Sequence, residues 1–296
     1  MSLELGNATV ISEIERIRMV GSAFHKTGRP VAFVPLTNGV HAGHIALVRA
    51  AKHIRGAVTV VALQSPHEED LELLRAEGVD IVWDYSTETL WPHGRRIAVA
   101  PVDAATALEP DLSEGLSLYL ALILTLSPTD VLLGEKDYEL LLAIHHAVQD
   151  FHLGVRVQGV PAIRMPDGVV MSLRNTSVPA GSRDQAAALS AALTAGAHAA
   201  EAGAEKVREV AAEVLRAAGV EPEYLEVRGR DLGTPPEEGD ARLLVAATIG
   251  GVRLIDNVGL PLGIGFNNIE EHEAKAELER EQQRAQDTAS QQPSED

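Results

Sequence analysis

The apolar positions of this chain follow two spacings, and each spacing predicts one kind of element. Between Ile11 and Phe24 they recur every three or four positions, which predicts a helix over 12–26 that ends beside Gly28. Over 57–63 apolar, mostly β-branched residues follow one another almost without a break, as in a strand buried on both faces. Because the two patterns alternate, we predict an α/β fold with a parallel sheet.

The same patterns predict the other elements of the first 175 residues. An apolar stretch at 112–126 indicates a buried helix, and Pro166-Asp167-Gly168 is a strong signal for a hairpin turn. The remaining predicted strands are 31–34, 79–83, 96–100, 130–133 and 155–160, and the remaining predicted helices are 45–51, 68–77 and 135–148.

The pattern changes after Asn175, and the chain reads as a second domain of another class. Two alanine-rich helical stretches precede three strands, which is an α+β arrangement. We therefore expect a parallel-sheet domain over 1–176, a smaller α+β domain over 177–262 and a tail over 263–296. The predicted helices of the second domain are 182–202 and 204–218, and its predicted strands lie near 224–227, 243–248 and 252–256.

Composition narrows the classes of function. The net charge of −18 argues against a nucleic-acid surface, which needs clustered Lys and Arg. The absence of cysteine excludes disulfides, zinc-thiolate sites and thiol nucleophiles. No window approaches the roughly 20 apolar residues of a membrane span, and the start does not resemble a signal peptide, so we expect a cytoplasmic protein. The tail carries nine acidic and three basic residues, which suits a solvated helix, a disordered end or a partner-binding segment.

The segment 31–51 reads as a strand, a loop and a helix, with His41 and His44 at the helix start. A helix N-terminus offers unpaired backbone N–H groups and the positive end of the macrodipole, so it suits a phosphate. Gly43 would let a nucleotide approach the helix backbone closely. From spacing alone, an alternative is equally good: the two histidines cap the helix and face solvent.

Two further polar segments lie later in the chain, one after a predicted strand and the other after the predicted hairpin turn. They are Gly134-Glu135-Lys136-Asp137 and 171–175, which contains Ser172 and Arg174. Because ligands of open α/β sheets bind beyond the carboxyl ends of the strands, we expect these segments to meet the two histidines. Imidazole, ammonium, hydroxyl and guanidinium groups together suit a polyphosphate and the charge that develops at an attacked α-phosphate. Taken singly, the first segment also suits a turn with a surface ion pair, and the second suits a strand end whose Arg pairs with a carboxylate.

In order and spacing these segments resemble the pantothenate synthetase family, the pantoate–β-alanine ligases of the HxGH nucleotidyltransferase superfamily. The resemblance implies a Rossmann-like first domain, a small second domain that covers the site, and a homodimer. It also implies a ligase that converts a carboxylic acid with ATP into an acyl adenylate, releases pyrophosphate and then transfers the acyl group to an amine. The similarity extends from about 28 to 263 and is densest at 34–35, 41–51, 74–79, 134–138, 159–161, 167–168, 171–175, 188–193, 224–226 and 256–257.

Matched residue by residue, the resemblance assigns a role to each candidate. His41 and His44 would contact the phosphates and the transition-state charge, and Lys136, Ser172 and Arg174 would hold phosphate oxygens. Gly134 and Asp137 would bind the ribose. The adenine pocket would consist of Val160, Ile163 and Met171.

The departures from the family pattern fall on the acid and amine side. The loop between Leu63 and Glu68 is shortened, Leu140 replaces a pantoate-binding Gln, and Glu114 replaces an Arg. Losing a hydrogen-bonding partner costs a buried polar group about 1 to 3 kcal/mol. The acid substrate is therefore pantoate or a different, less polar acid. The smaller departures are Leu36-Thr37-Asn38 in the first loop and Leu173 beside Ser172.

The family's Mg²⁺ ligand falls within Glu68-Glu69-Asp70, which makes Glu69 and Asp70 the metal candidates. Three functions follow from this set of residues. The first is an ATP-dependent carboxylate–amine ligase, which the retained His, Lys, Ser and Arg favour. The second is a nucleotidyltransferase that keeps only adenylyl transfer. The third is a catalytically poor paralogue that binds nucleotide as a regulatory or assembly subunit.

Overall fold

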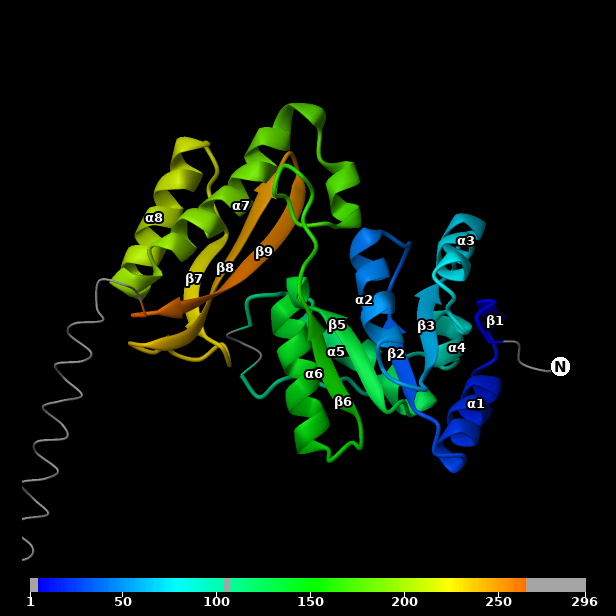
Figure 1. The fold of residues 1–296 in the computed structure, drawn as a ribbon. Coiled ribbons are helices and arrows are strands. Elements are labelled where there is room, and N and C mark those ends of the chain that lie inside the picture. Colours follow the sequence, from blue (N-terminus) through cyan, green and yellow to red (C-terminus); the bar gives the residue numbers. More distant parts are fainter. Residues whose placement is uncertain (1–4, 104–106, 265–296) are drawn as a thin grey trace, which may run out of the picture.

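The computed structural model describes residues 5–103 and 107–264. Its larger part is a six-stranded parallel sheet in the order β1-β4-β3-β2-β5-β6, as the alternating pattern predicted (Figure 1). The strands are β1 (Thr9–Ile11), β2 (Val31–Pro35), β3 (Val58–Gln64), β4 (Ile81–Tyr85), β5 (Asp130–Gly134) and β6 (Arg156–Val160).

Helices cover both faces of this sheet, and an apolar core fills each side. One core packs α1, α5 and α6 on the sheet, and the other packs α2 and α3. Apolar residues of the central strands alternate between the two cores, which explains their continuous apolar pattern. The helices are α1 (Ile14–Lys26), α2 (Ala42–Lys52), α3 (Glu68–Ala76), α4 (Thr87–Leu90), α5 (Leu112–Leu126) and α6 (Tyr138–Asp150).

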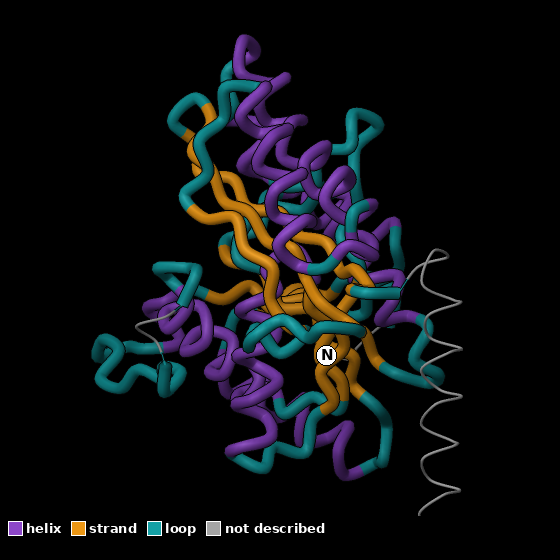
Figure 2. Tube along the Cα trace, turned by 90° about the vertical axis from the view of Figure 1, so that its left-hand side faces the viewer, coloured by secondary structure: helices purple, strands orange, loops and turns teal. Residues whose placement is uncertain are grey.

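The second part of the chain has its own antiparallel sheet, β7-β8-β9, and its own apolar core under two helices. Figure 2 shows these helices running alongside the strands. All strands of the parallel sheet precede residue 176 and all strands of the small sheet follow it, although the expected domain limits themselves stay a prediction. The elements are α7 (Arg183–His198), α8 (Ala204–Ala217), β7 (Tyr224–Gly229), β8 (Gly239–Ile249) and β9 (Val252–Leu262).

Short 3-10 helices follow strand ends or flank the helices of the second part. They are η2 (Glu135–Asp137), η3 (Leu173–Ser177), η4 (Ala180–Ser182) and η5 (Ala200–Ala202). No helix in the described part of the chain is long and apolar enough to cross a membrane. The tail expected over 263–296 lies outside the described residues from 265 onward.

Two predictions of secondary structure are wrong. Residues 96–100 form no strand: Ile97 is 81% exposed, and the backbone N–H of Val99 donates to the Ser117 hydroxyl of α5 instead of a sheet partner. Ile11 belongs to the edge strand β1 and not to the face of α1, because β1 pairs with β4. The predicted turn at 166–168 is present, closed by a hydrogen bond from Gly168 N to Met165 O of 2.8 Å.

Candidate active site

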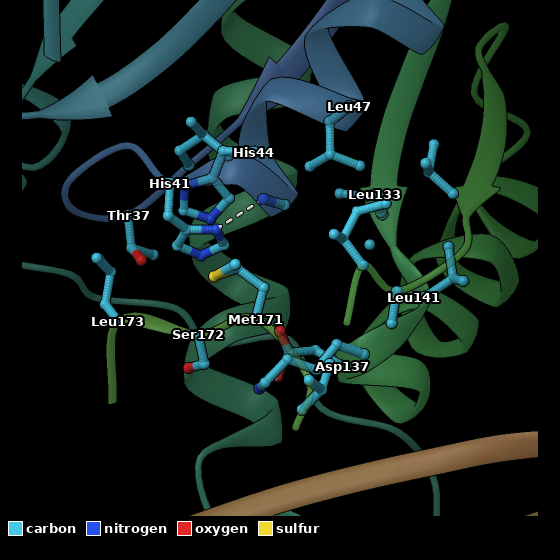
Figure 3. Close-up of a pocket in the computed structure, with 18 of the residues that line it drawn as sticks. Thr37, His41, His44, Leu47, Leu133, Asp137, Leu141, Met171, Ser172 and Leu173 are labelled. Atoms are coloured by element: carbon cyan, nitrogen blue, oxygen red, sulfur yellow. Dashed lines mark hydrogen bonds and ion pairs between the residues drawn. The ribbon is translucent and has the colours of Figure 1, made fainter. Parts of the chain in front are cut away.

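A cavity of about 390 Å³ opens at the carboxyl ends of three neighbouring strands (Figure 3). Pro35 ends β2, Gly134 ends β5 and Val160 ends β6, and all three residues line the cavity. From β2 the chain continues to β3 on one side, while β5 pairs with β2 on the other. This is the point where strand order reverses and where open parallel sheets bind their ligands.

His41 is the N-cap residue of α2, and its Nδ1 accepts a hydrogen bond of 3.0 Å from the backbone N–H of Gly43. Since Nδ1 accepts, the proton of the neutral ring lies on Nε2, where it can be donated to a ligand. A Cβ at position 43 would lie 2.8 Å from the Cε1 of His41. Gly43 therefore makes room first for the His41 ring, which refines the expectation that it makes room for a nucleotide.

His44 lies one turn further along α2, and its ring stacks on that of His41 with centroids 3.7 Å apart (Figure 3). Its Nδ1 is 3.1 Å from the carbonyl oxygen of Gly39, so the neutral ring carries its proton on Nδ1 and leaves a lone pair on Nε2. Burial, with the neighbouring His41 second, lowers the pKa of His44 to about 4. Burial and then the charge of Lys136 lower the pKa of His41. Both rings are therefore neutral at pH 7.

Two cations line the same cavity as the histidines. Lys136 lies in η2, directly after β5, with its ammonium 3.2 Å from Oδ1 of Asp137 and its side chain only 17% exposed. Arg174 lies in η3, where the Ser172 hydroxyl accepts a 3.2 Å hydrogen bond from the Arg174 backbone N–H. No carboxylate in the described part of the chain pairs with the Arg174 guanidinium. Thus the Lys136–Asp137 pair lines the cavity with the lysine side chain largely buried and the Asp137 side chain 56% exposed, and Arg174 is available to an anion.

The structure brings the two imidazoles, the cations and the predicted apolar wall to this one cavity. Apolar side chains from several elements complete the wall on the far side of the histidines (Figure 3). Of the predicted site residues, those that line it are His41, Gly43, His44, Gly134, Lys136, Asp137, Val160, Ile163, Met171, Ser172 and Arg174.

Sequence reasoning missed several residues of the wall. Leu47 lies one turn after His44 and Leu133 directly precedes Gly134, so both follow from the motifs once the strand and helix ends are known. Leu141 lies on α6 one turn after Asp137. Tyr119 of α5 has no such signal, because its place in an apolar helix predicted only burial.

The metal candidates are not brought to the cavity. Asp70 is buried, with Oδ1 accepting from Val40 N at 2.7 Å and Oδ2 from His67 N at 3.0 Å. It therefore closes the capping box of α3 and holds the loop that leads to His41. Glu69 is exposed, and neither residue is among the described residues that line the cavity. The described residues also contain no group of three or more His, Asp or Glu side chains that could hold a metal ion.

A second cavity, of about 770 Å³, lies between the first domain and the small sheet. Leu140 and Tyr119 line both cavities, and Glu114 lies in the second, 3.7 Å from Arg95. Of the departures noted in the sequence, Leu140 therefore lies where the two cavities meet, Glu114 lies in the second cavity, and the shortened loop between Leu63 and Glu68 lines neither. The residues shared by both are Thr37, Tyr119, Lys136, Asp137, Leu140 and Arg174.

The sheet order and the position of the cavity define a Rossmann-like α/β protein with its ligand site at the strand ends. The sequence model described as Pantoate-beta-alanine ligase matches residues 9–259. A curated pantothenate synthetase of Corynebacterium jeikeium is 42% identical over 293 residues, which span 92% of this chain and 96% of the relative. That of Mycolicibacterium vanbaalenii is 39% identical, over 88% of this chain and 90% of its own. The chain belongs to the pantoate–β-alanine ligase family.

Solved structures agree with this assignment. The pantothenate synthetase of Thermus thermophilus superposes with a TM-score of 0.74 and 28% identity, over 84% of this chain and 98% of the other. A pantoate-beta-alanine ligase of Francisella tularensis, crystallised with β-γ ATP and β-alanine, superposes with a TM-score of 0.69 over 84% and 97% of the two chains. At 24% identity, that second likeness concerns the fold.

Proposed function

We propose that this chain is an ATP-dependent ligase that joins a carboxylic acid to an amine through an acyl adenylate, with pantoate and β-alanine as its first candidate substrates. One observation carries the proposal: His41, Lys136 and Arg174 line a single cavity at the strand ends, in a chain of the pantoate–β-alanine ligase family. A pure scaffold that binds no nucleotide has no need of two cations and a directed imidazole N–H.

In the first step a carboxylate oxygen of the acid bonds to the α-phosphorus while the bond to the α–β bridging oxygen breaks and pyrophosphate leaves. The ammonium of Lys136, the guanidinium of Arg174 and the Nε2–H of His41 stabilise the charge on the phosphate oxygens. In the second step the neutral amine attacks the acyl carbon, AMP leaves, and the amine nitrogen loses one proton.

The other cavity residues hold the nucleotide in this proposal. Asp137 and the backbone at Gly134 bind the ribose hydroxyls, and the Ser172 hydroxyl contacts a phosphate oxygen. The apolar wall of Val160, Ile163 and Met171 receives the adenine. The acid lies where the two cavities meet, against Leu140, so an acid with an apolar group on that side fits best.

Magnesium, a homodimer and a cytoplasmic location complete the proposal. Mg²⁺ accompanies ATP and neutralises phosphate charge when bound. Glu69 and Asp70 do not fit as its ligands because of their positions, so we assign no step to a protein-held metal. The molar mass from light scattering, measured at several protein concentrations, tests the dimer.

The experiment that tests the function is ATP–pyrophosphate exchange, measured with pantoate and then with a panel of carboxylic acids. We expect exchange that depends on the acid, followed by amide formation when β-alanine is added. Exchange with another acid but not with pantoate would show that the chain is a ligase whose acid substrate is not pantoate. If no acid supports exchange although calorimetry shows that ATP binds, the ligase function is contradicted and a nucleotide-binding subunit is supported.

A further inference from the structure

Two adjacent residues of the small sheet, Asp256 and Asn257, contact the segments that carry the cavity's cations. Both lie in β9 and are buried, with 3% and 7% of their surfaces exposed. Their side chains reach out of the small sheet to η2 and to the loop before η3. The residues that these contacts join are separated in the sequence by 92 positions for Arg164 and Asp256 and by 121 positions for Lys136 and Asn257.

The Asn257 amide holds the backbone on which Lys136 is mounted. Its Nδ2 donates to the carbonyl oxygens of Glu135 at 3.0 Å and of Lys136 at 2.8 Å. Its Oδ1 accepts from Arg242, whose guanidinium also contacts the Glu135 carboxylate at 3.2 Å and stacks over the Tyr138 ring at 3.7 Å. Because Arg242 can only donate, it fixes Oδ1 on its own side and aims both N–H groups at the two carbonyls.

Asp256 holds the other segment through Arg164. The carboxylate forms a bidentate ion pair with the guanidinium of Arg164, at 2.6 and 3.0 Å. The same guanidinium donates to the carbonyl oxygen of Gly168 at 3.1 Å and to the hydroxyl of Ser190 at 3.2 Å. It thereby ties the turn at 164–170 to β9 and α7, and this turn leads directly to Met171, Ser172 and Arg174.

We infer that the Asp256-Asn257 pair positions both phosphate-contacting segments, so that the small domain sets the affinity of the cavity for nucleotide. The inference rests on the proposed function, because it assumes that Lys136 and Arg174 bind phosphate. Fixing the backbone of these segments costs conformational entropy. The pair meets this cost during folding, so that it does not reduce the binding energy of the nucleotide.

The test uses two changes at Asn257. Asn257→Asp has the same shape and keeps an acceptor for Arg242, but it loses both donors to the carbonyls of Glu135 and Lys136. It also places a second carboxylate on Arg242 beside that of Glu135, so Asn257→Ala, which adds no charge, is the second variant. In the full-length chain we expect either change to raise the dissociation constant of ATP about tenfold in calorimetry.

Lys136→Ala shows whether Asn257 acts through Lys136 or only supports the fold. If Asn257 positions the ammonium, Asn257→Asp weakens ATP binding less than twofold once Lys136 is alanine, because the two effects are then not additive. Gln185→Ala is the control: it removes another side-chain amide that donates to a backbone carbonyl, that of Gly219 at 3.4 Å, away from the cavity. We expect this control to bind ATP as the unchanged chain does.

The outcomes separate the two proposals. If the unchanged chain does not bind ATP, the proposed function is wrong. If the unchanged chain binds ATP and both Asn257 variants bind ATP as tightly as it does, the positioning role is wrong. The role is also wrong if Asn257→Asp weakens ATP binding by the same factor with and without Lys136.

Discussion

At the scale of single residues, the two histidines of the cavity differ in which nitrogen faces a ligand. Neutral His41 presents the N–H of Nε2, because its Nδ1 accepts a hydrogen bond from the Gly43 backbone. Neutral His44 presents the lone pair of Nε2, because its Nδ1–H donates to the Gly39 carbonyl oxygen. His41 is therefore the donor for a phosphate oxygen at pH 7. His44 becomes a donor only after it binds a second proton.

This difference predicts unequal results for matched asparagine variants. Asn at position 41 can keep the acceptor for Gly43 N–H while it removes the Nε2–H. We expect His41→Asn to reduce pyrophosphate exchange about 10²-fold, the usual value of one charge-stabilising donor. His44→Asn, which can keep the bond to Gly39 but loses the ring that stacks on His41, should reduce exchange about tenfold. Equal exchange in His41→Asn and the unchanged chain would remove His41 from the mechanism.

The lowered pKa of His44 makes a second prediction at this scale. A polyphosphate beside the ring favours the imidazolium, so ATP binding should raise the pKa of His44 above about 4 and take up a proton near pH 6. Calorimetry of ATP binding in buffers of different ionisation enthalpy measures this uptake. His44→Asn should lower this uptake by the share of His44, and equal uptake in the variant would assign the proton to another group.

The same shift affects stability, with a definite sign. The unfolded chain binds a proton at the usual histidine pKa of about 6.5, and the folded chain at about 4, so between these values the unfolded state holds more protons. The contribution of His44 is therefore complete above pH 6.5 and is lost as the pH falls towards 4. Protonated His44 would remain buried beside His41, so its protonation lowers the free energy of unfolding.

At the scale of elements, the N-terminus of α2 shows a conflict between helix propensity and the site. Alanine favours a helix over glycine by about 1 kcal/mol, yet a Cβ at position 43 would lie 2.8 Å from the His41 ring. We expect Gly43→Ala to keep or raise the melting temperature while it reduces pyrophosphate exchange at least about tenfold, because His41 must rotate.

A glycine in open space provides the control for this variant. A Cβ at Gly181, in η4, would meet no atom within 4 Å, so Gly181→Ala should leave exchange unchanged. If Gly43→Ala also keeps full exchange, the position of the His41 ring does not limit the reaction. A variant that instead loses stability would show that α2 cannot tolerate the added Cβ at all.

The elements also show what the sequence could predict. Strands with long apolar runs and helices with clear spacing were predicted within a few residues. The segments after β2 and β5 meet as the strand-end rule requires, and 171–175 joins them from beyond the turn at 166–168. Residues 96–100 have an apolar content that suits a strand, but no neighbouring strand pairs with them. The roles of Asp256 and Asn257 depend on contacts across about 90 to 120 residues, which no local pattern encodes.

At the scale of the whole molecule, polar contacts in the wall of the second cavity join the two domains. Arg253 of β9 pairs with Glu109, in the loop before α5, at 2.6 Å and with Glu223, beside β7, also at 2.6 Å. The Tyr224 hydroxyl donates to the same Glu109 carboxylate at 2.8 Å. Hydrogen bonding to Glu109 raises the pKa of Arg253. One guanidinium therefore neutralises carboxylates from both parts of the chain.

Because this contact is polar and partly buried, its loss should separate the unfolding of the two domains. Arg253→Gln leaves Glu109 and Glu223 without their cation, and we expect it to lower stability by about 1 to 3 kcal/mol. In scanning calorimetry the single transition expected of the unchanged chain should broaden or split, since each part keeps its own apolar core.

Arg208→Gln on α8 is the matched control for the domain contact. It removes an ion pair with Glu205 of the same 2.6 Å length, but the two side chains are 51% and 82% exposed and lie on one helix. Such surface pairs contribute only about 0 to 1 kcal/mol, so one transition near the original temperature is expected. If Arg253→Gln behaves like this control, the domains are coupled through β9 and the cavity segments alone, and Asn257 variants should then split the transition in its place.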